Sequence, residues 1–420
     1  MTQAALRASC CIAGGGPAGM VLGLLLARAG IATIVLEKHA DFLRDFRGDT
    51  IHPSTMEVMR EIGLLDAFLR LPHQKAISAA AQIGDRMLRL ADFTHLPTAC
   101  KFAAFMPQWD FLDFLAEEAR RHPAFRLVMS AEVTGLIEED GRIAGVRAVT
   151  PEGPVEIRAD LTIGADGRHS TVRRAAGLAT IDLGAPIDVV WLRLPRRAGD
   201  ARQVLGRIDA GRFLVMLDRD EYWQCAFVIP KGGLDRLRAG GLEAFRRDLA
   251  RLAGLPAERT EALRGWDDVK LLTVAVDRLR RWHRPGLLCI GDAAHAMSPV
   301  GGVGINLAIQ DAVAAANILA GPLAHGAPGE RHLRAVQRRR MLPTRITQRA
   351  QVLIQNRVIG PVLLSAAPPR IPLALRLLDR WPLLRRLPAR AIGLGVRPEH
   401  VKTRPAAAAS GSTRRAERLR

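Results

Sequence analysis

The chain has 420 residues, 48% hydrophobic and 25% charged, a composition that supports a large core and predicts two packed domains. Its net charge of +19 comes from one end: residues 331–420 hold 21 Lys and Arg against 3 Asp and Glu, which leaves 40 basic and 39 acidic residues elsewhere. The neutral body and the single tyrosine argue against a nucleic-acid partner, because aromatic and basic side chains are not interleaved.

The five cysteines are odd in number and form no CxxC pair, which argues against a disulfide framework and against a metal site. We find no secretory signal pattern, and no apolar run reaches the roughly 20 residues that cross a bilayer. We therefore expect a cytoplasmic protein. For the basic region 331–404 an ordinary solvated surface is favoured, with peripheral membrane contact as the alternative.

The first elements carry the signals of a βαβ unit: an apolar strand at Ser9–Ala13, a glycine-rich turn, a helix over Pro17–Ala29 and a strand at Ile31–Lys38. The turn reads GxGxxG, whose glycines permit a tight turn, a close backbone approach to a pyrophosphate and close packing of helix on strand. Glu37 ends the second strand, where a carboxylate can accept hydrogen bonds from adenosine ribose and disfavours a 2′-phosphate. The predicted cofactor-binding residues of this unit are Gly14, Gly16, Pro17, Ala18, Gly19, Glu37 and Lys38.

The next segment changes from a helix to short strands. An amphipathic helix is predicted over Asp110–Arg121, and strands are predicted near residues 126–128, 132–138, 143–149 and 155–158. A further apolar strand is predicted at Leu161–Ala165, directly before an Asp-Gly pair. This alternation is typical of an α/β fold.

From about residue 181 to 276 alternating strands predict an antiparallel sheet, interrupted by a helix over Leu242–Leu252. The strands are expected at residues 188–194, 211–217, 222–229 and 270–276. We expect this sheet to cover the bound cofactor and to carry the substrate contacts. The candidate substrate-binding residues on it are Trp191, Arg193, Met216, Tyr222 and Gln224.

A second glycine-rich motif follows the sheet. A strand at Gly286–Ile290 returns to the first domain and ends at Gly291 and Asp292, a carboxylate placed to accept hydrogen bonds from ribityl or ribose hydroxyls. The loop Pro299–Gly304 then opens a helix over Val303–Leu319, whose positive end would face the N1/C2 edge of a flavin. A nicotinamide dehydrogenase has no use for this second motif, whereas FAD is long enough to need a site at each end. FAD is therefore the predicted cofactor.

We predict an α/β fold (α+β overall) with a Rossmann-like FAD-binding domain, an inserted antiparallel-sheet substrate domain and C-terminal helices. The FAD-binding domain is assigned to residues 1–180 and 277–330, with part of the substrate region near 70–105. The substrate domain is assigned to 181–276, a basic helical region to 331–404, and a disordered tail to 405–420.

The chain resembles the group A flavoprotein monooxygenases, the family of FAD-dependent aromatic hydroxylases that includes para-hydroxybenzoate hydroxylase. Three motifs carry the resemblance in order: "GGGPAG", "GADGRHSTVR" and "GDAAHAMSPVGGVGIN", accompanied by "FRGDTIHPSTMEVMREIGLL" at Phe46–Leu65. The resemblance implies that Arg47 lies near the FAD pyrophosphate and that Gln108 contacts the cofactor. The remaining cofactor-binding residues that it implies are Asp166, Gly167 and Arg173 of the middle motif and Gly291, Asp292, Gly304, Ile305 and Asn306 of the last one.

The same resemblance implies a reaction. NADH or NADPH would reduce FAD, and the reduced flavin would react with O2 to give a C4a-hydroperoxide that hydroxylates an aromatic or related electron-rich small molecule. Pro299, Gly301 and Gly302 would line the flavin ring and are the predicted catalytic contacts. His52 and His295 are interpreted as hydrogen-bonded structural histidines.

Two alternatives stay open. One is an FAD-dependent reductase of isoprenoid double bonds, similar to geranylgeranyl reductase, and the other is a ubiquinone-type hydroxylase within the preferred class. A flavin-dependent halogenase is disfavoured, because "YWQCAFVIP" lacks the second tryptophan of the WxWxIP signature. Oxygen consumption distinguishes the reductase from the hydroxylases.

Overall fold

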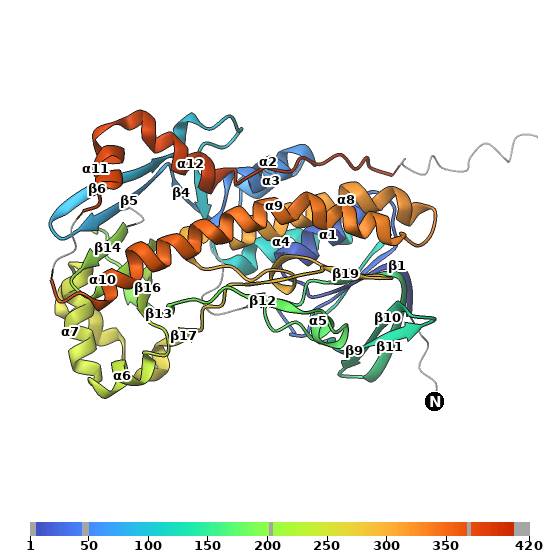
Figure 1. Ribbon diagram of the computed structural model, residues 1–420, viewed down its shortest axis with the longest axis horizontal. Helices are drawn as coiled ribbons and strands as arrows, with labels where there is room; N and C mark the ends of the chain where they lie inside the picture. Colours follow the sequence, from blue (N-terminus) through green and yellow to red (C-terminus); the bar gives the residue numbers. More distant parts are fainter. Residues whose placement is uncertain (1–5, 44–49, 201–204, 368–370, 407–420) are drawn as a thin grey trace, which may run out of the picture.

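The computed structural model describes residues 6–43, 50–200, 205–367 and 371–406 of the chain. Figure 1 shows two large sheets at opposite ends of the molecule, with the long helices α8 (Gly304–Ala324) and α9 (Glu330–Ile354) running between them. The largest hydrophobic core lies around the first sheet, and a second core lies behind the other sheet.

The first sheet contains the predicted βαβ unit. β1 (Leu6–Ala13) pairs in parallel with β2 (Thr33–Leu36) and with β11 (Gly153–Gly164). The strand order is β19-β20-β11-β1-β2-β8, with β8 (Phe125–Val128) at one edge, and β20 (Leu287–Cys289) and β19 (His283–Arg284) at the other. α1 (Pro17–Arg28) packs against both α4 (Gln108–Arg120) and α8, and almost all of its residues are buried. This mainly parallel, helix-covered sheet confirms the predicted α/β class with its Rossmann-like FAD domain.

One strand assignment was wrong. The segments 155–158 and 161–165, predicted as separate strands, belong to the single strand β11. Its first half pairs antiparallel with β10 (Arg142–Thr150), which continues to β9 (Glu132–Glu139), and its second half pairs in parallel with β1 and β20. The strand continues without a break and only passes from one set of partners to another.

The second sheet has the order β17-β13-β16-β15-β14-β5-β6. The hairpin of β5 (Ser78–Ile83) and β6 (Arg86–Asp92) joins it, and the assignment of part of the substrate region to residues near 70–105 stays a prediction. The strands between residues 181 and 276 pair antiparallel with one another, as predicted, and β14 adds a parallel pairing with β5 from outside that range. The other strands are β13 (Ile187–Pro195), β14 (Leu205–Asp209), β15 (Arg212–Asp218), β16 (Tyr222–Pro230) and β17 (Lys270–Leu272), and α6 (Leu234–Ala239) and α7 (Leu242–Ala253) follow β16.

Two small sheets connect the large ones. The chain leaves the first sheet through β12 (Thr180–Asp182) and returns through β18 (Asp277–Leu279), and these two strands pair with each other. β3 (Thr50–Ile51), β7 (Ala103–Phe105) and β4 (Gln74–Ala76) form the other small sheet, and α2 (Pro53–Glu61) and α3 (Leu65–Leu69) follow β3. The domain limits at residues 180 and 277 stay a prediction that coincides with the β12–β18 ribbon.

The C-terminal helices are α9, α10 (Gly360–Leu364), α11 (Leu373–Arg380) and α12 (Arg386–Gly393), with a π-helical turn at Gln355–Ile359. Within the described residues only the segment Val300–Ala324, essentially α8, is long and apolar enough to cross a membrane. About two thirds of its most apolar window is buried in the protein (67%), as expected for a core helix. Of the tail predicted at 405–420, residues 407–420 lie outside the described part.

Candidate active site

The glycine turn after β1 leaves no room for side chains at two positions. A Cβ atom at Gly14, where φ is +107°, would lie 2.4 Å from the carbonyl oxygen of Ala165. A Cβ atom at Gly19 would lie 1.9 Å from the Gly14 carbonyl oxygen, so the helix and the strand can meet this closely only with glycine. Gly16 is different, because a Cβ there would have nothing within 4 Å. The turn is therefore tight on its protein side and open on its outer side.

α1 begins at Pro17 directly behind this open position. No side chain caps its N-terminus, and no acidic residue lies in its first turn. Its first N–H groups and the positive end of its dipole are therefore available to an anion. Ala18, the next residue, is buried.

Glu37 lies at the end of β2, beside the glycine turn. Its carboxylate is buried and accepts hydrogen bonds from the N–H groups of Gly15 (3.0 Å) and His39 (3.1 Å). The structure thus places Glu37 beside the glycine turn, and its contact with a ribose stays a prediction. The neighbouring Lys38 is exposed. Arg47, the predicted partner of the pyrophosphate, lies outside the described residues.

The last motif meets α1 at Gly291. This residue has φ of +58°, and a Cβ there would lie 3.2 Å from the Cβ atoms of both Ala18 and Ala308. The motif that follows β20 is therefore packed between the beginnings of α1 and α8. Asp292, next in the chain, is half-buried, and no hydrogen-bond donor in the described part of the chain reaches its carboxylate.

The loop before α8 forms the other end of this region. Pro299 begins a short turn in which Gly301 and Gly302 have φ of +80° and +63°. α8 then starts at Gly304 without a side-chain cap and without an acidic residue in its first turn. Two uncapped helix N-termini, those of α1 and α8, thus lie on either side of Gly291.

The start of α2 holds this loop in place. The imidazole Nε2 of His52 lies 3.0 Å from the Gly302 carbonyl oxygen. The hydroxyls of Ser54 and Thr55 donate to Oδ1 of Asn306, at 2.6 and 3.2 Å. Asn306 therefore joins α8 to α2, and Ile305 is partly buried beside it.

The predicted residues of the middle motif are engaged in local structure. The Asp166 carboxylate accepts hydrogen bonds from the Ser170 hydroxyl (2.5 Å) and from the Val172 N–H group (3.0 Å), which fixes the start of α5 (Thr171–Ala175). The Arg173 guanidinium lies 3.4 Å from the Asp277 carboxylate. Of the other predicted residues, Gly167 has φ of +83° and Gln108 is the half-buried first residue of α4. Their contact with a cofactor stays a prediction.

Four of the five candidate substrate residues lie on one face of the second sheet. Trp191 packs in the same cluster as Val300 of the loop before α8. In the pairing of β13 with β16, Arg193 is opposite Gln224, and its guanidinium lies 5.0 Å from the ring centroid of Tyr222. This face is the one directed towards the loop.

Met216 does not belong with the other four. It is 3% exposed and packs in the core between the sheet and α7. In a strand, successive side chains point to opposite faces, and Met216 falls on the other face from its neighbour Val215. We therefore correct its assignment: Met216 is a core residue, not a substrate contact.

Comparison with known proteins identifies the family. The family model described as FAD binding domain (FAD_binding_3) matches residues 7–350. The 6-methylpretetramide 4-monooxygenase of Streptomyces rimosus is 33% identical over 378 residues, which cover 89% of this chain and 90% of that protein. The chain belongs to this family of FAD-dependent monooxygenases. The group A resemblance and the predicted FAD cofactor are thereby confirmed.

Other matches agree with this assignment. A 12-dehydrotetracycline 5-monooxygenase/anhydrotetracycline 6-monooxygenase of Streptomyces rimosus subsp. rimosus is 30% identical over 339 residues, 77% of this chain and 65% of that protein. This chain thus spans just under two thirds of that relative. Among solved structures, the OxyS anhydrotetracycline hydroxylase from Streptomyces rimosus has a TM-score of 0.71 at 24% identity, covering 94% of this chain and 77% of that one. PqsL from Pseudomonas aeruginosa, solved with 2-aminobenzoylacetate, has a TM-score of 0.72 at 21% identity, covering 85% and 97%.

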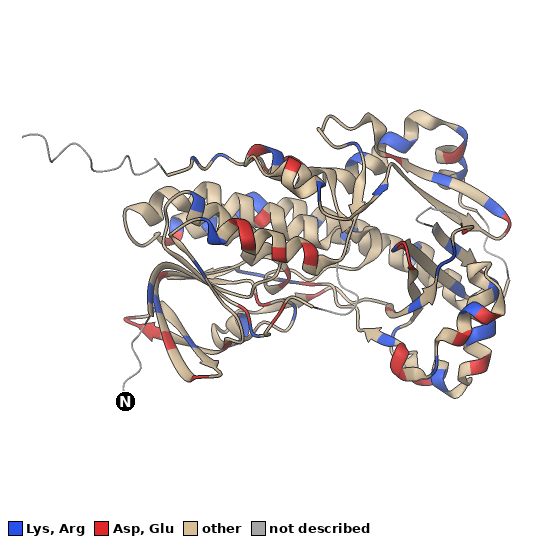
Figure 2. Ribbon diagram, turned by 180° about the vertical axis from the view of Figure 1, so that it is seen from behind, with Lys and Arg blue, Asp and Glu red and all other residues tan. Residues whose placement is uncertain are grey.

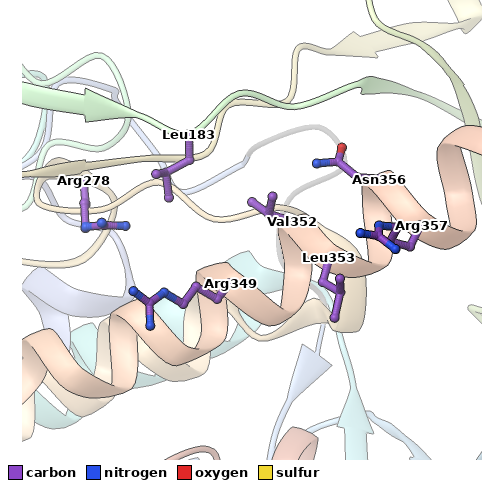
Figure 3. A pocket seen from close by; sticks show the side chains of 7 residues that line it. All are labelled: Leu183, Arg278, Arg349, Val352, Leu353, Asn356 and Arg357. Atoms are coloured by element: carbon purple, nitrogen blue, oxygen red, sulfur yellow. The ribbon is translucent and has the colours of Figure 1, made fainter.

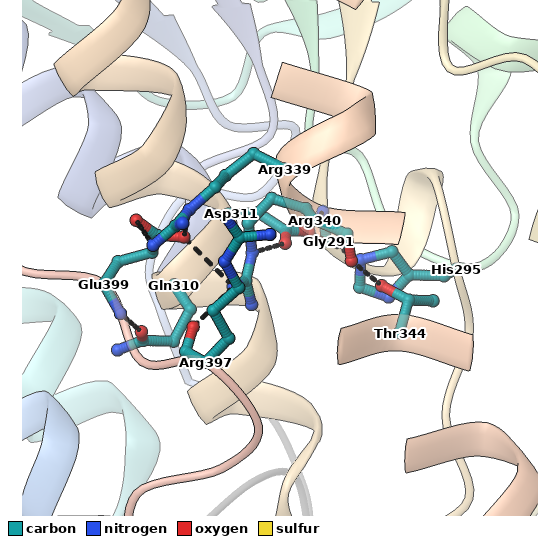
Figure 4. A network of polar contacts seen from close by, with 9 residues as sticks. All are labelled: Gly291, His295, Gln310, Asp311, Arg339, Arg340, Thr344, Arg397 and Glu399. Atoms are coloured by element: carbon teal, nitrogen blue, oxygen red, sulfur yellow. Dashed lines mark hydrogen bonds and ion pairs between the residues drawn. The ribbon is translucent and has the colours of Figure 1, made fainter. Parts of the chain in front are cut away.

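The monooxygenase has a buried ionic network behind the last motif (Figure 4). His295 Nε2 lies 2.5 Å from one Asp311 carboxylate oxygen, which also accepts a hydrogen bond from the Gly291 N–H group at 3.1 Å. The other oxygen accepts from Arg340 Nε at 2.9 Å, and Arg340 also reaches Glu399. Burial opposes ionisation of Asp311, but the His295 and Arg340 contacts outweigh it and hold the pKa of that carboxyl below its ordinary value. His295 is thus a hydrogen-bonded structural residue, as interpreted from the sequence.

Glutamines near the end of α9 and at the first residue of the π-helical turn bind the loop of the monooxygenase from the other side. Gln348 donates to the Ala296 carbonyl oxygen at 3.0 Å, and Gln355 donates to the Ser298 hydroxyl at 2.6 Å. Gln351 donates to the carbonyl oxygens of Ser298 and Val300, both at 2.9 Å, and accepts from the Ser298 N–H group at 3.2 Å. The sequence analysis missed these residues. The available signal in the sequence was the spacing of these glutamines by three and four residues, which places them on one face of an otherwise strongly basic helix.

The outer side of α9 borders a separate cavity of about 480 Å³ (Figure 3). It lies between α9 and the segment after β12, and it is rich in arginine. The residues that line it are Leu183, Arg278, Arg349, Val352, Leu353, Asn356 and Arg357. Burial lowers the pKa of Arg278, and the neighbouring charges of Arg345 and Arg349 lower it further. None of these residues belongs to the sites predicted from the sequence.

Proposed function

We propose that the monooxygenase uses NADH or NADPH and O2 to hydroxylate an aromatic polyketide. The observation that carries this proposal is the convergence of two uncapped helix N-termini, those of α1 and α8, at Gly291. The names of the two Streptomyces relatives support the substrate class, because both include substrates of the tetracycline type.

The residues from the glycine turn to the N-terminus of α8 fit a bound FAD. The open turn at Gly16 and the free N-terminus of α1 would hold the diphosphate, and Glu37 would bind the adenosine ribose. Asp292 would bind the ribityl hydroxyls, since no donor in the described part of the chain occupies its carboxylate. The N-terminus of α8, with the turn at Gly301, would lie at the ring. When bound, FAD supplies the hydride acceptance and the oxygen activation of the reaction.

The second sheet would hold the substrate against this loop. Trp191 presents an aromatic surface beside Val300 and helps to keep water out. Arg193 is exposed at the same face, where its guanidinium suits a phenolate or a carboxylate on the substrate. These side chains orient the ring to be hydroxylated.

The test is oxidation of NADH and of NADPH by the purified, FAD-loaded protein with 6-methylpretetramide, anhydrotetracycline and simple phenols, together with product masses. We expect substrate-stimulated oxidation that needs O2 and adds one oxygen atom to a multi-ring substrate. Oxidation that does not need O2 and adds two hydrogens to a prenyl substrate would contradict the proposal and favour the isoprenoid reductase.

A matched pair of variants tests the substrate face. Trp191→Ala removes an aromatic contact on the loop side and is expected to raise KM for the preferred substrate about tenfold or more, with the flavin spectrum unchanged. Met216→Leu conserves volume on the opposite side of the sheet and is expected to leave KM unchanged. Equal effects of the two variants would place the substrate elsewhere.

A further inference from the structure

The helices α11 and α12, with the turn between them, lie over the end of the second sheet (Figure 1). Both pack against β6, an edge strand of that sheet. Their inner side is well covered: Ala389 is fully buried against Phe93 and Leu96. The hairpin of α11 and α12 is thus firmly seated on its inner side.

The outer side of this hairpin is apolar. Leu373, Leu377 and Trp381 follow each other at intervals of four, as do Leu383 and Leu387, and all five side chains are 38–69% exposed. Leu373 and Leu377 share one face of α11, because a spacing of four places side chains on the same face of a helix. Trp381 and Leu383 follow in the connection between the two helices, and Leu387 lies in the first turn of α12. Single exposed leucines are common on soluble proteins, but five exposed large apolar side chains within fifteen residues are a local concentration of apolar surface.

The same outer side is basic. Arg376 and Arg380 precede Leu377 and Trp381 in the chain, and Arg386 and Arg390 are exposed on α12, where the Arg386 guanidinium also lies 3.4 Å from His95 Nε2. Asp379 is the one acidic residue between positions 371 and 394. Its carboxylate is engaged with β6, where it accepts from the Arg89 N–H group at 3.3 Å and lies 3.5 Å from the Arg86 guanidinium. Figure 2 shows blue segments prevailing on these helices.

We propose that the outer side of α11 and α12 docks on the surface of an anionic lipid membrane. Leucine and tryptophan side chains partition into the boundary between headgroups and acyl chains, while arginines extend to the lipid phosphates. A second copy of the chain fits this side poorly, because a two-fold interface would bring arginines against arginines with no acidic side chain to neutralise them. The complement of a surface that is apolar and purely cationic is one that is apolar and anionic.

This docking would give the molecule a definite orientation. β6 is an edge strand of the second sheet, so the proposed substrate domain would face the lipid. The sequence 407–420 is also basic, with Arg414, Arg415, Arg418 and Arg420. It is a second source of attraction to anionic lipid, so its contribution is measured separately from that of α11 and α12.

The experiment is co-sedimentation of the FAD-loaded full chain with vesicles of phosphatidylcholine alone and with about 30% phosphatidylglycerol. We expect binding to the anionic vesicles that weakens with salt, and at least about tenfold weaker binding to neutral ones. The double variant Leu377→Glu/Trp381→Glu is expected to lower the affinity about tenfold or more. Leu342→Glu, which changes a 51% exposed leucine on α9, is the matched control and is expected to bind as the unaltered chain does.

The readout does not depend on turnover, so the result stands whatever the substrate is. Undiminished binding by the double variant would overturn the proposal, and so would binding that disappears on removal of residues 407–420 alone. Light scattering on the same samples tests the alternative that a second copy of the chain binds to this side. A dimer that the double variant dissociates would assign this side to a second copy and would also overturn the proposal.

Discussion

At the scale of single residues, His52 links the start of α2 to the loop before α8. Its ring is 1% exposed, Nε2 contacts the Gly302 carbonyl oxygen, and within the described residues Nδ1 is buried without a partner. Burial lowers the pKa of His52, and the Gly302 contact offsets this only in part. The folded protein therefore favours the neutral ring. The contribution of the neutral ring to the free energy of unfolding is fully present above the ordinary histidine pKa. It is lost as the pH falls through the lowered pKa that His52 has in the folded protein.

This predicts acid-sensitive flavin retention. We expect FAD to dissociate several-fold more readily near about pH 5 than near neutrality, because protonation would bury an N–H group without an acceptor. His52→Gln keeps an amide donor for Gly302 but does not titrate, so its FAD retention should depend less on pH. Flavin fluorescence during a pH titration of both proteins measures this, and superimposable profiles would contradict it.

At the scale of an element, α9 acts as a rigid support for the loop. Gln351 makes three hydrogen bonds to Ser298 and Val300, so replacing it by leucine would leave three backbone groups of the loop without these partners. We expect Gln351→Leu to lower the free energy of unfolding by about 2–4 kcal/mol and to weaken FAD binding. Urea unfolding and FAD titration measure the two effects. Arg349→Gln, an exposed change on the same helix, is the control and should have little effect, and equal losses in the two variants would refute this role for Gln351.

At the scale of the whole molecule, residues 395–406 bind the end of the chain to its beginning. Glu399 pairs with Arg339 at 2.6 Å and with the fully buried Arg340 at 3.4 Å. Farther on, the Val401 N–H group donates to Glu61 at 2.7 Å, and the Ala406 N–H group donates to a carbonyl of α1 at 2.8 Å. This segment therefore crosses α9, α8, α2 and α1 and closes the FAD-binding region.

Breaking that closure should destabilise the protein. Glu399→Gln would leave Arg340 with Asp311 as its one carboxylate, and we expect the free energy of unfolding to fall by about 3 kcal/mol. Removal of residues 407–420, which follow the described part of the segment, should change it by less than about 0.5 kcal/mol. Chemical denaturation of the three proteins measures both values. A neutral Glu399→Gln variant would show that the segment does not secure the fold.

The local sequence determined the elements that depend on short-range patterns. The strand, glycine turn and helix at Ser9–Ala29 follow from apolar runs and from glycines that cannot carry a Cβ, and the structure has them within a few residues of the prediction. The helix at the last motif was also predicted, and the region after it was predicted to be helical without the bounds of α9. Together with the motif order, these elements were sufficient to identify the family and its cofactor.

Only the tertiary structure decided which distant segments meet and which way side chains face. The face on which Met216 lies depends on the register of β15 against β16, and a shift of one residue would reverse it. The joining of β5 to β14, the contacts of Gln351 with the loop and the pairing of Asp311 with Arg340 connect residues from 29 to more than 100 positions apart. No local pattern encodes such partners, because their energy is gained only when packing has excluded water from both groups.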